Sequence, residues 1–221
     1  MKKISGICLM LLLHTLYAFS QCETVLKTYT EGTSFQVVTY SMKDEVISTT
    51  NYTVQEIRKE ADRILVMLKF STLNKKGKET EKGSRSIIVS GGNYLNNLSA
   101  VIPGYKSDDP NYIQYACAPQ AGTDIPEFSK VTTYTEDNMG QISITSNKVG
   151  LEDGKYASNE EITTPAGTFN CIKLDYKIRL DLQDFSYTEW IDAATGRTIK
   201  SLRSDKKGDP ENYSLLTSFN N

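Results

Sequence analysis

Short runs of alternating apolar and polar residues recur along most of this chain. In residues 34–40, for example, Phe35, Val37 and Thr39 fall on one face of an extended chain. β-branched and aromatic residues dominate these runs and turn residues bound them, which is typical of strands. The pattern predicts strands over residues 34–40, 46–57, 64–70, 86–89, 129–134, 141–149, 160–164, 168–180, 185–191, 198–202 and 214–219.

The residues between these runs predict tight hairpin turns. In Thr164-Pro165-Ala166-Gly167, Pro165 sets the φ of the first central position and Gly167 can take a positive φ. Similar quartets that end in glycine occur at residues 74–77, 193–196 and 205–208. Because hairpins join antiparallel neighbours, we expect an all-β fold with a single, mainly antiparallel sheet.

Two stretches depart from the strand pattern. Residues 57–65 place apolar side chains near helical spacing, but their many charges favour a turn between two strands. Residues 90–128 contain most of the prolines and predict one irregular central connection, with a short helix as an interpretation of residues 94–102. Neither stretch has the composition of a linker, so we expect a single β domain over residues 21–221.

Residues 1–20 have the three parts of a secretory signal peptide. Lys2 and Lys3 supply the positive start, residues 7–13 the apolar centre, and Ala18-Phe19-Ser20 the small residues of a cleavage site. The apolar centre is shorter than the roughly 20 residues that span a bilayer, and no later stretch is a transmembrane candidate. We therefore expect a periplasmic or secreted protein without a transmembrane segment.

Cleavage of that segment changes which chemistry remains. The one histidine, His14, lies inside it, so no imidazole is left for a catalytic triad, a proton shuttle or a metal site. Removal of Lys2 and Lys3 takes the net charge from −2 to −4, and a mildly acidic chain lacks the basic surface that nucleic acids require. We expect a protein that is not an enzyme, takes no cofactor or metal, and binds no nucleic acid.

The exported part of the chain keeps Cys22, Cys117 and Cys171, and an oxidising compartment favours one disulfide among them. Cys22 and Cys117 lie in irregular segments, whereas Cys171 lies in a predicted strand, where a free cysteine can act as a small apolar residue. These positions favour a Cys22–Cys117 bridge, with a bridge to Cys171 as the alternative. Lipid anchoring at Cys22 would need a small residue before it, and that residue is Gln21.

The residues around the 164–167 turn carry a family resemblance. Residues 161–174, EITTPAGTFNCIKL, resemble a hairpin of TapB-family proteins, which are exported proteins of Bacteroidota-type bacteria with a domain like domain-of-unknown-function 3108. Glu189-Trp190, Gly196, Lys200 and residues 213–217 fit the same pattern. Family members often have a cysteine where this chain has Ser90, so no family disulfide can be carried over. The resemblance implies an antiparallel sheet that curls into a half-barrel or roll, and it implies no activity.

A curved sheet offers a concave face for a ligand, and this gives the first functional hypothesis. We expect a non-enzymatic protein of the cell envelope that binds an apolar or amphipathic small molecule. A module that docks an envelope protein through a sheet edge is the second hypothesis. A carbohydrate-binding or carbohydrate-active protein is the third, with Trp190 and Glu189 as ligand contacts and Asp192 as the second carboxylate. The plain alternative for this pair is a solvent-facing Glu189 beside a core Trp190.

Overall fold

The computed structural model describes Cys22 and residues 29–102, 105, 107–108, 111–138, 141–181 and 183–220. The expected signal peptide, residues 1–20, lies outside the described residues. The described chain forms twelve strands and one short 3₁₀ helix. These are β1 (Ser34–Ser41), β2 (Val46–Lys59), β3 (Arg63–Asn74), β4 (Glu79–Ser90), β5 (Asn93–Asn97), η1 (Leu98–Ala100), β6 (Tyr112–Ala116), β7 (Phe128–Asn138), β8 (Gln141–Thr164), β9 (Gly167–Leu180), β10 (Gln183–Asp192), β11 (Thr198–Ser204) and β12 (Pro210–Asn220).

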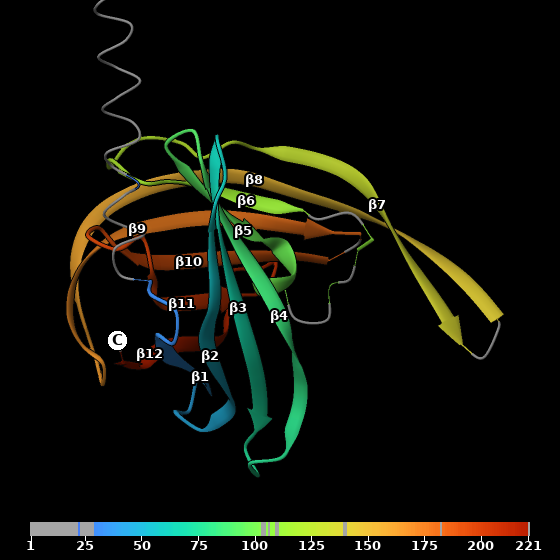
Figure 1. The fold of residues 1–221 in the computed structure, drawn as a ribbon, viewed down its shortest axis with the longest axis horizontal. Coiled ribbons are helices and arrows are strands. Elements are labelled where there is room, and N and C mark those ends of the chain that lie inside the picture. Colours follow the sequence, from blue (N-terminus) through green and yellow to red (C-terminus); the bar gives the residue numbers. More distant parts are fainter. Residues whose placement is uncertain are drawn as a thin grey trace, which may run out of the picture.

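All twelve strands belong to one antiparallel sheet, in the order β6-β5-β4-β3-β2-β1-β12-β11-β10-β9-β8-β7. Neighbours in the sheet are also neighbours in sequence, except where β1 pairs with β12. The sheet is strongly curved, so that the N-terminal half, β1–β6, crosses the C-terminal half, β7–β12, in Figure 1. The all-β class and the single, curved, mainly antiparallel sheet expected from the sequence are therefore confirmed.

The main hydrophobic core lies between the two halves of the curved sheet. It combines fully buried side chains of the N-terminal half, such as Val54 and Ile113, with those of the C-terminal half, such as Leu151 and Ile178. A smaller core contains Cys171, Trp190, Ile199 and Leu216. Burial of so much apolar surface between strands distant in sequence is what holds the sheet in its curved form.

A row of aromatic side chains joins the two halves at the centre of the sheet. Phe219 of β12, Phe35 of β1, Tyr52 of β2 and Phe70 of β3 are consecutive partners in register. Their ring centroids lie 6.4, 4.8 and 6.2 Å apart along the row. Aromatic pairs of this kind contribute about 0.5–1.5 kcal/mol each beyond their burial, so the row helps to fix the strand register.

The prediction of separate strands over residues 141–149 and 160–164 is wrong, because both ranges belong to β8. Strand β8 is one strand of 24 residues. Its register against β9 shifts between Glu152 and Lys155 and again between Tyr156 and Asn159, and Asp153 has a φ of 54°. Such bulges bend a strand and interrupt its alternation, which is why the sequence pattern appeared to stop there.

The central connection is also more regular than the sequence predicted. It contains the two strands β5 and β6, and the helix expected over residues 94–102 is reduced to η1. The Asn97 side chain caps η1 by accepting a hydrogen bond from the Ser99 N–H. Asparagine is unfavourable in strands, so pairing with β4 and burial of Tyr94 override local preference in β5. Residues 60–62 form the turn favoured for the charged stretch.

We expect Gly167→Val to lower the free energy of unfolding by about 1–2 kcal/mol. Gly167 follows Pro165 in the β8–β9 turn and has a φ of 135°, a conformation that side chains disfavour. The neighbouring change Ala166→Ser keeps the backbone requirement and should have little effect. Urea denaturation of both variants measures the difference, and equally small effects would contradict the strained-glycine account.

Candidate ligand pocket at the sheet edge

The two edges of the sheet meet through the connection between β6 and β7. Residues 122–125 of this connection run along β8. Gly122 N donates to Tyr156 O at 2.7 Å, Tyr156 N donates to Thr123 O at 2.9 Å, and Ile125 N donates to Gly154 O at 3.0 Å. The chain thus runs from β6, at one end of the sheet, directly to β8, next to the other end, and forms backbone hydrogen bonds with it.

Tyr156 links these two edges directly. Its hydroxyl accepts a hydrogen bond of 2.9 Å from the backbone N–H of Ala116, the last residue of β6. Burial raises the pKa of Tyr156 to about 12, so the phenol stays protonated at neutral pH. Because the side chain is almost fully buried, it acts as a fixed strut between β8 and β6.

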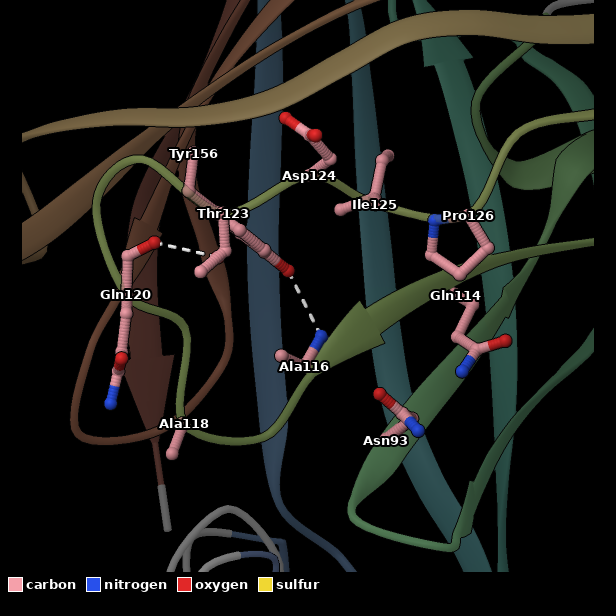
Figure 2. A pocket seen from close by; sticks show the side chains of 10 residues that line it. All are labelled: Asn93, Gln114, Ala116, Ala118, Gln120, Thr123, Asp124, Ile125, Pro126 and Tyr156. Carbon is pink, nitrogen blue, oxygen red and sulfur yellow. Dashed lines mark hydrogen bonds between the residues drawn. The ribbon is translucent and has the colours of Figure 1, made fainter.

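A pocket of about 330 Å³ lies beside this strut (Figure 2). We call it the edge pocket. Its lining combines neutral polar residues with small or apolar ones and has one carboxylate, that of Asp124. The lining residues are Asn93, Gln114, Ala116, Ala118, Gln120, Thr123, Asp124, Ile125, Pro126 and Tyr156. This mixture of amides, a hydroxyl and apolar surface is suited to an uncharged ligand with hydrogen-bonding groups.

One wall of the edge pocket is fixed by a close approach between Ile125 and Gly154. Ile125 is buried, and its side chain lies where a Cβ on residue 154 would stand. Any side chain at position 154 would therefore displace Ile125. The absence of a side chain at Gly154 lets the connection pack tightly on β8 and sets the position of this wall.

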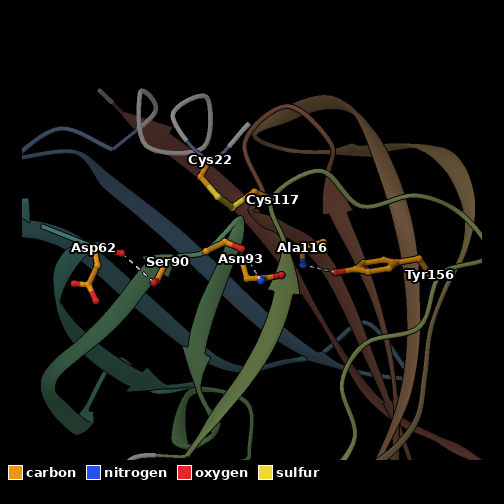
Figure 3. The surroundings of a disulfide bond; sticks show 8 residues. Cys22, Asp62, Ser90, Asn93, Ala116, Cys117 and Tyr156 are labelled. Carbon is orange, nitrogen blue, oxygen red and sulfur yellow. Dashed lines mark hydrogen bonds between the residues drawn. A yellow bond between two sulfur atoms is a disulfide. The ribbon is translucent and has the colours of Figure 1, made fainter. Parts of the chain in front are cut away.

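The structure contains a Cys22–Cys117 disulfide, the pairing that the sequence positions favour. Figure 3 shows it next to Ala116, and Cys117 separates the pocket residues Ala116 and Ala118. The bridge therefore fixes the point where the chain leaves β6. Cys171 is free and buried, and burial raises the pKa of its thiol to about 12, which makes it unreactive.

Glu189 and Trp190 do not line the edge pocket, and Glu189 is not solvent-facing as one interpretation had it. Glu189 points into the main core, is 5% exposed, and accepts a hydrogen bond of 3.0 Å from the Tyr115 hydroxyl. Burial raises its pKa to about 7, although the hydroxyls of Tyr115 and Tyr176 lower it. Trp190 points to the smaller core and donates to Glu160 at 2.7 Å.

The carboxylates that a carbohydrate-active enzyme would need are engaged in separate local contacts. Glu189 bonds to Tyr115, whereas Asp192 accepts a hydrogen bond of 2.6 Å from the Thr195 hydroxyl inside the β10–β11 turn. Within the described residues there is no group of three or more His, Cys, Asp or Glu side chains placed to hold a metal ion. None of the helical segments described has the length and hydropathy needed to cross a bilayer.

The edge pocket was missed at the sequence level because its residues come from segments far apart. Asn93 belongs to β5, Gln114 to β6 and Tyr156 to β8, and no local motif connects them. The one available signal was the density of asparagine, glutamine and proline in residues 90–128. That composition marks irregular chain and does not identify which residues converge.

Comparison with known proteins places this curved sheet in a family. The chain belongs to the DUF3108-like family, whose model matches residues 30–216, so the resemblance to proteins with domain-of-unknown-function 3108 is confirmed. A proposed lipoprotein of Parabacteroides distasonis has a similar solved structure, with a TM-score of 0.68 and 21% identity over 86% of this chain and 96% of that one.

A proposed exported protein of Bacteroides fragilis with a YmcC-like fold is similar in the same way. Its TM-score is 0.69, with 17% identity over 87% of this chain and 97% of that one. At these identities the likeness is one of fold. No curated protein matches the chain.

Proposed function

We propose that this chain is an exported, non-catalytic protein of the cell envelope that binds a small, uncharged ligand in the edge pocket. Export is supported by the signal-peptide pattern of residues 1–20 and by the Cys22–Cys117 disulfide, which needs an oxidising compartment to persist. The two structural neighbours, described as an exported protein and a lipoprotein, support the same location.

The edge pocket is the observation that carries the binding role. Its volume of about 330 Å³ lies at the small end of the range for ligand sites, about 300–1,000 Å³. Its walls are held by three independent constraints: the Tyr156–Ala116 hydrogen bond, the disulfide at Cys117 and the packing of Ile125 on Gly154. A preformed pocket loses little conformational entropy when it binds a ligand, so even a small contact area can give useful affinity.

The chemistry of the lining favours binding over catalysis. The Tyr156 hydroxyl is already bonded to Ala116, and with a pKa of about 12 it is a poor general base at neutral pH. Asp124 is the one carboxylate in the lining and lies in an exposed position. A role for Asp124 as a selective contact for a hydrogen-bond donor on the ligand is consistent with this arrangement.

A protein-docking role is the second candidate, and one observation favours it. Val131 of β7 and Ile142 and Ile144 of β8 are 68–69% exposed. They lie on one face of the β7–β8 hairpin, which projects from the body of the molecule in Figure 1. Exposed aliphatic side chains gathered on a projecting hairpin are a common feature of interaction surfaces.

A pocket-filling variant tests the ligand-binding proposal. Ala118 is exposed at the pocket wall, so Ala118→Trp should fill the space without disturbing the core. Ala194→Trp places the same side chain on an exposed turn and serves as the control. We expect native mass spectrometry of protein isolated from its own envelope to show a bound small molecule in the natural protein and in Ala194→Trp, but not in Ala118→Trp. Equal occupancy in all three, or none in any, would contradict the proposal.

A further inference from the structure

Strand β6 ends the sheet and, within the described chain, pairs with β5 alone. In an antiparallel pair, alternate residues direct their N–H and C=O groups toward the partner strand and away from it. Cys117 N donates to Gly92 O and Leu98 N donates to Asn111 O, so the odd-numbered residues of this strand face β5. The backbone N–H and C=O of Gln114 therefore point away from β5, toward the free edge.

This free edge faces the edge pocket. Ala116 is two residues from Gln114 and has the same orientation, and its N–H reaches the hydroxyl of Tyr156, a pocket residue. Gln114 itself lines the pocket, together with Ile125 and Pro126 of the facing connection (Figure 2). Since β6 pairs with no strand other than β5, no strand in the described chain uses the outward donor and acceptor of Gln114.

We propose that the ligand of the edge pocket is a short peptide segment in extended conformation, which adds to β6 by pairing with the Gln114 backbone. This inference rests on the proposed function and specifies its ligand class. An extended peptide residue presents one N–H and one C=O on the same side, and this pattern matches the outward C=O and N–H of Gln114. A residue opposite Gln114 would make two backbone hydrogen bonds in the pocket.

The lining also limits which peptide fits. Ala116, Ala118, Ile125 and Pro126 leave room only for small side chains beside the peptide backbone in about 330 Å³. No lysine or arginine lines the described pocket, so nothing there balances a free terminal carboxylate. The pocket therefore suits a short peptide that brings no charged terminus into it, such as a run of alanine-like residues, in preference to a charged C-terminus.

A proline substitution separates backbone recognition from side-chain recognition. Gln114→Pro removes the outward N–H and leaves the bonds to β5 intact, because an edge strand tolerates proline where its N–H faces outward. Gln114→Ala removes the side chain and keeps the N–H. The probe is N-acetyl-trialanine amide, titrated into the ¹⁵N-labelled, disulfide-bonded protein and followed by the backbone amide signals in NMR.

We expect the Gln114 amide signal to shift most, and Gln114→Pro to bind about tenfold more weakly than Gln114→Ala, which keeps the backbone N–H. If Gln114→Pro does not fold, a trialanine analogue with an ester oxygen in place of the central amide N–H tests the other bond of the pair on the natural protein, because it removes the peptide's donor to the Gln114 C=O. It should also bind about tenfold more weakly. Equal binding of amide and ester, or full binding by a folded Gln114→Pro, would overturn the inference.

The two proposals fail in different ways. A non-peptide molecule that occupies the pocket and is expelled by Ala118→Trp, without any binding of the peptide, would overturn the peptide assignment and leave the binding function standing. Peptide binding that Ala118→Trp does not affect would place the peptide outside the edge pocket and overturn the peptide assignment. Equal occupancy of a small molecule in the natural protein and in Ala118→Trp would overturn the binding function.

Discussion

Replacing Glu189 by glutamine is expected to stabilise the protein by about 3 kcal/mol at about pH 8 and to have almost no effect below about pH 4.5. Glu189 is a carboxyl group in the main core, and burial raises its pKa from the ordinary 4.5 to about 7. Glutamine has nearly the same shape and carries no charge at any pH. The variant thus removes the cost of a buried charge without opening a cavity.

The sign of the pH dependence follows from the pKa of Glu189 in the folded protein and its ordinary pKa in the unfolded chain. Between about pH 4.5 and 7 the folded protein holds a proton on Glu189 that the unfolded chain releases. The carboxyl therefore costs nothing below this range, and its cost grows as the pH rises through it and then levels off. At about 1.4 kcal/mol per pKa unit, the full shift corresponds to about 3 kcal/mol.

Denaturant unfolding of Glu189→Gln and the natural protein across this pH range measures the effect. Glu161→Gln removes the same charge from an exposed position on β8 and is the matched control, with little change in the free energy of unfolding expected. A constant difference between Glu189→Gln and the natural protein at all pH values would show that Glu189 does not titrate in this range. A gain that grows with pH would show that the carboxyl group bonded to Tyr115 in the core is neutral at the lower end of this range.

The parts of the fold that the sequence predicted well are those that local chemistry decides. The predicted strand at residues 34–40 corresponds to β1 and that at residues 168–180 to β9, because β-branched and aromatic residues recur in both and residues 172–180 alternate apolar with polar side chains. The turn glycines also behave as expected, with Gly77, Gly196 and Gly208 all at positive φ. The alternation of apolar and polar residues and the positions of turn glycines depend on neighbouring residues in the chain. Both can therefore be recognised in a single sequence.

The features that the sequence did not predict depend on contacts between distant segments. Strand β5 has the sequence NYLNN and forms because Tyr94 is buried and β4 and β6 pair on either side of it. Glu189 appeared solvent-facing because its partner, Tyr115, lies 74 positions away in the chain. The edge pocket has the same origin, since it exists only where curvature brings β6 against β8.

Loss of the Cys22–Cys117 disulfide is expected to lower the free energy of unfolding by up to about 4–5 kcal/mol. The bridge joins residues separated by 95 positions, and a crosslink across so long a loop removes much of the entropy of the unfolded chain. Thermal unfolding of the Cys22→Ser/Cys117→Ser double variant measures this loss. Cys171→Ala, which removes a buried free thiol and no crosslink, is the control and should have a much smaller effect.

The same bond is incompatible with lipid anchoring at Cys22. The sulfur of Cys22 cannot form a disulfide with Cys117 and carry a lipid thioether at the same time. Non-reducing peptide mapping and intact mass of the exported protein should therefore show the Cys22–Cys117 peptide and no lipid. A lipid on Cys22, or a bridge from Cys117 to Cys171, would contradict this. The end of β6 would then be held without its bridge to Cys22, and the walls of the edge pocket at Ala116 and Ala118 would lose one of their constraints.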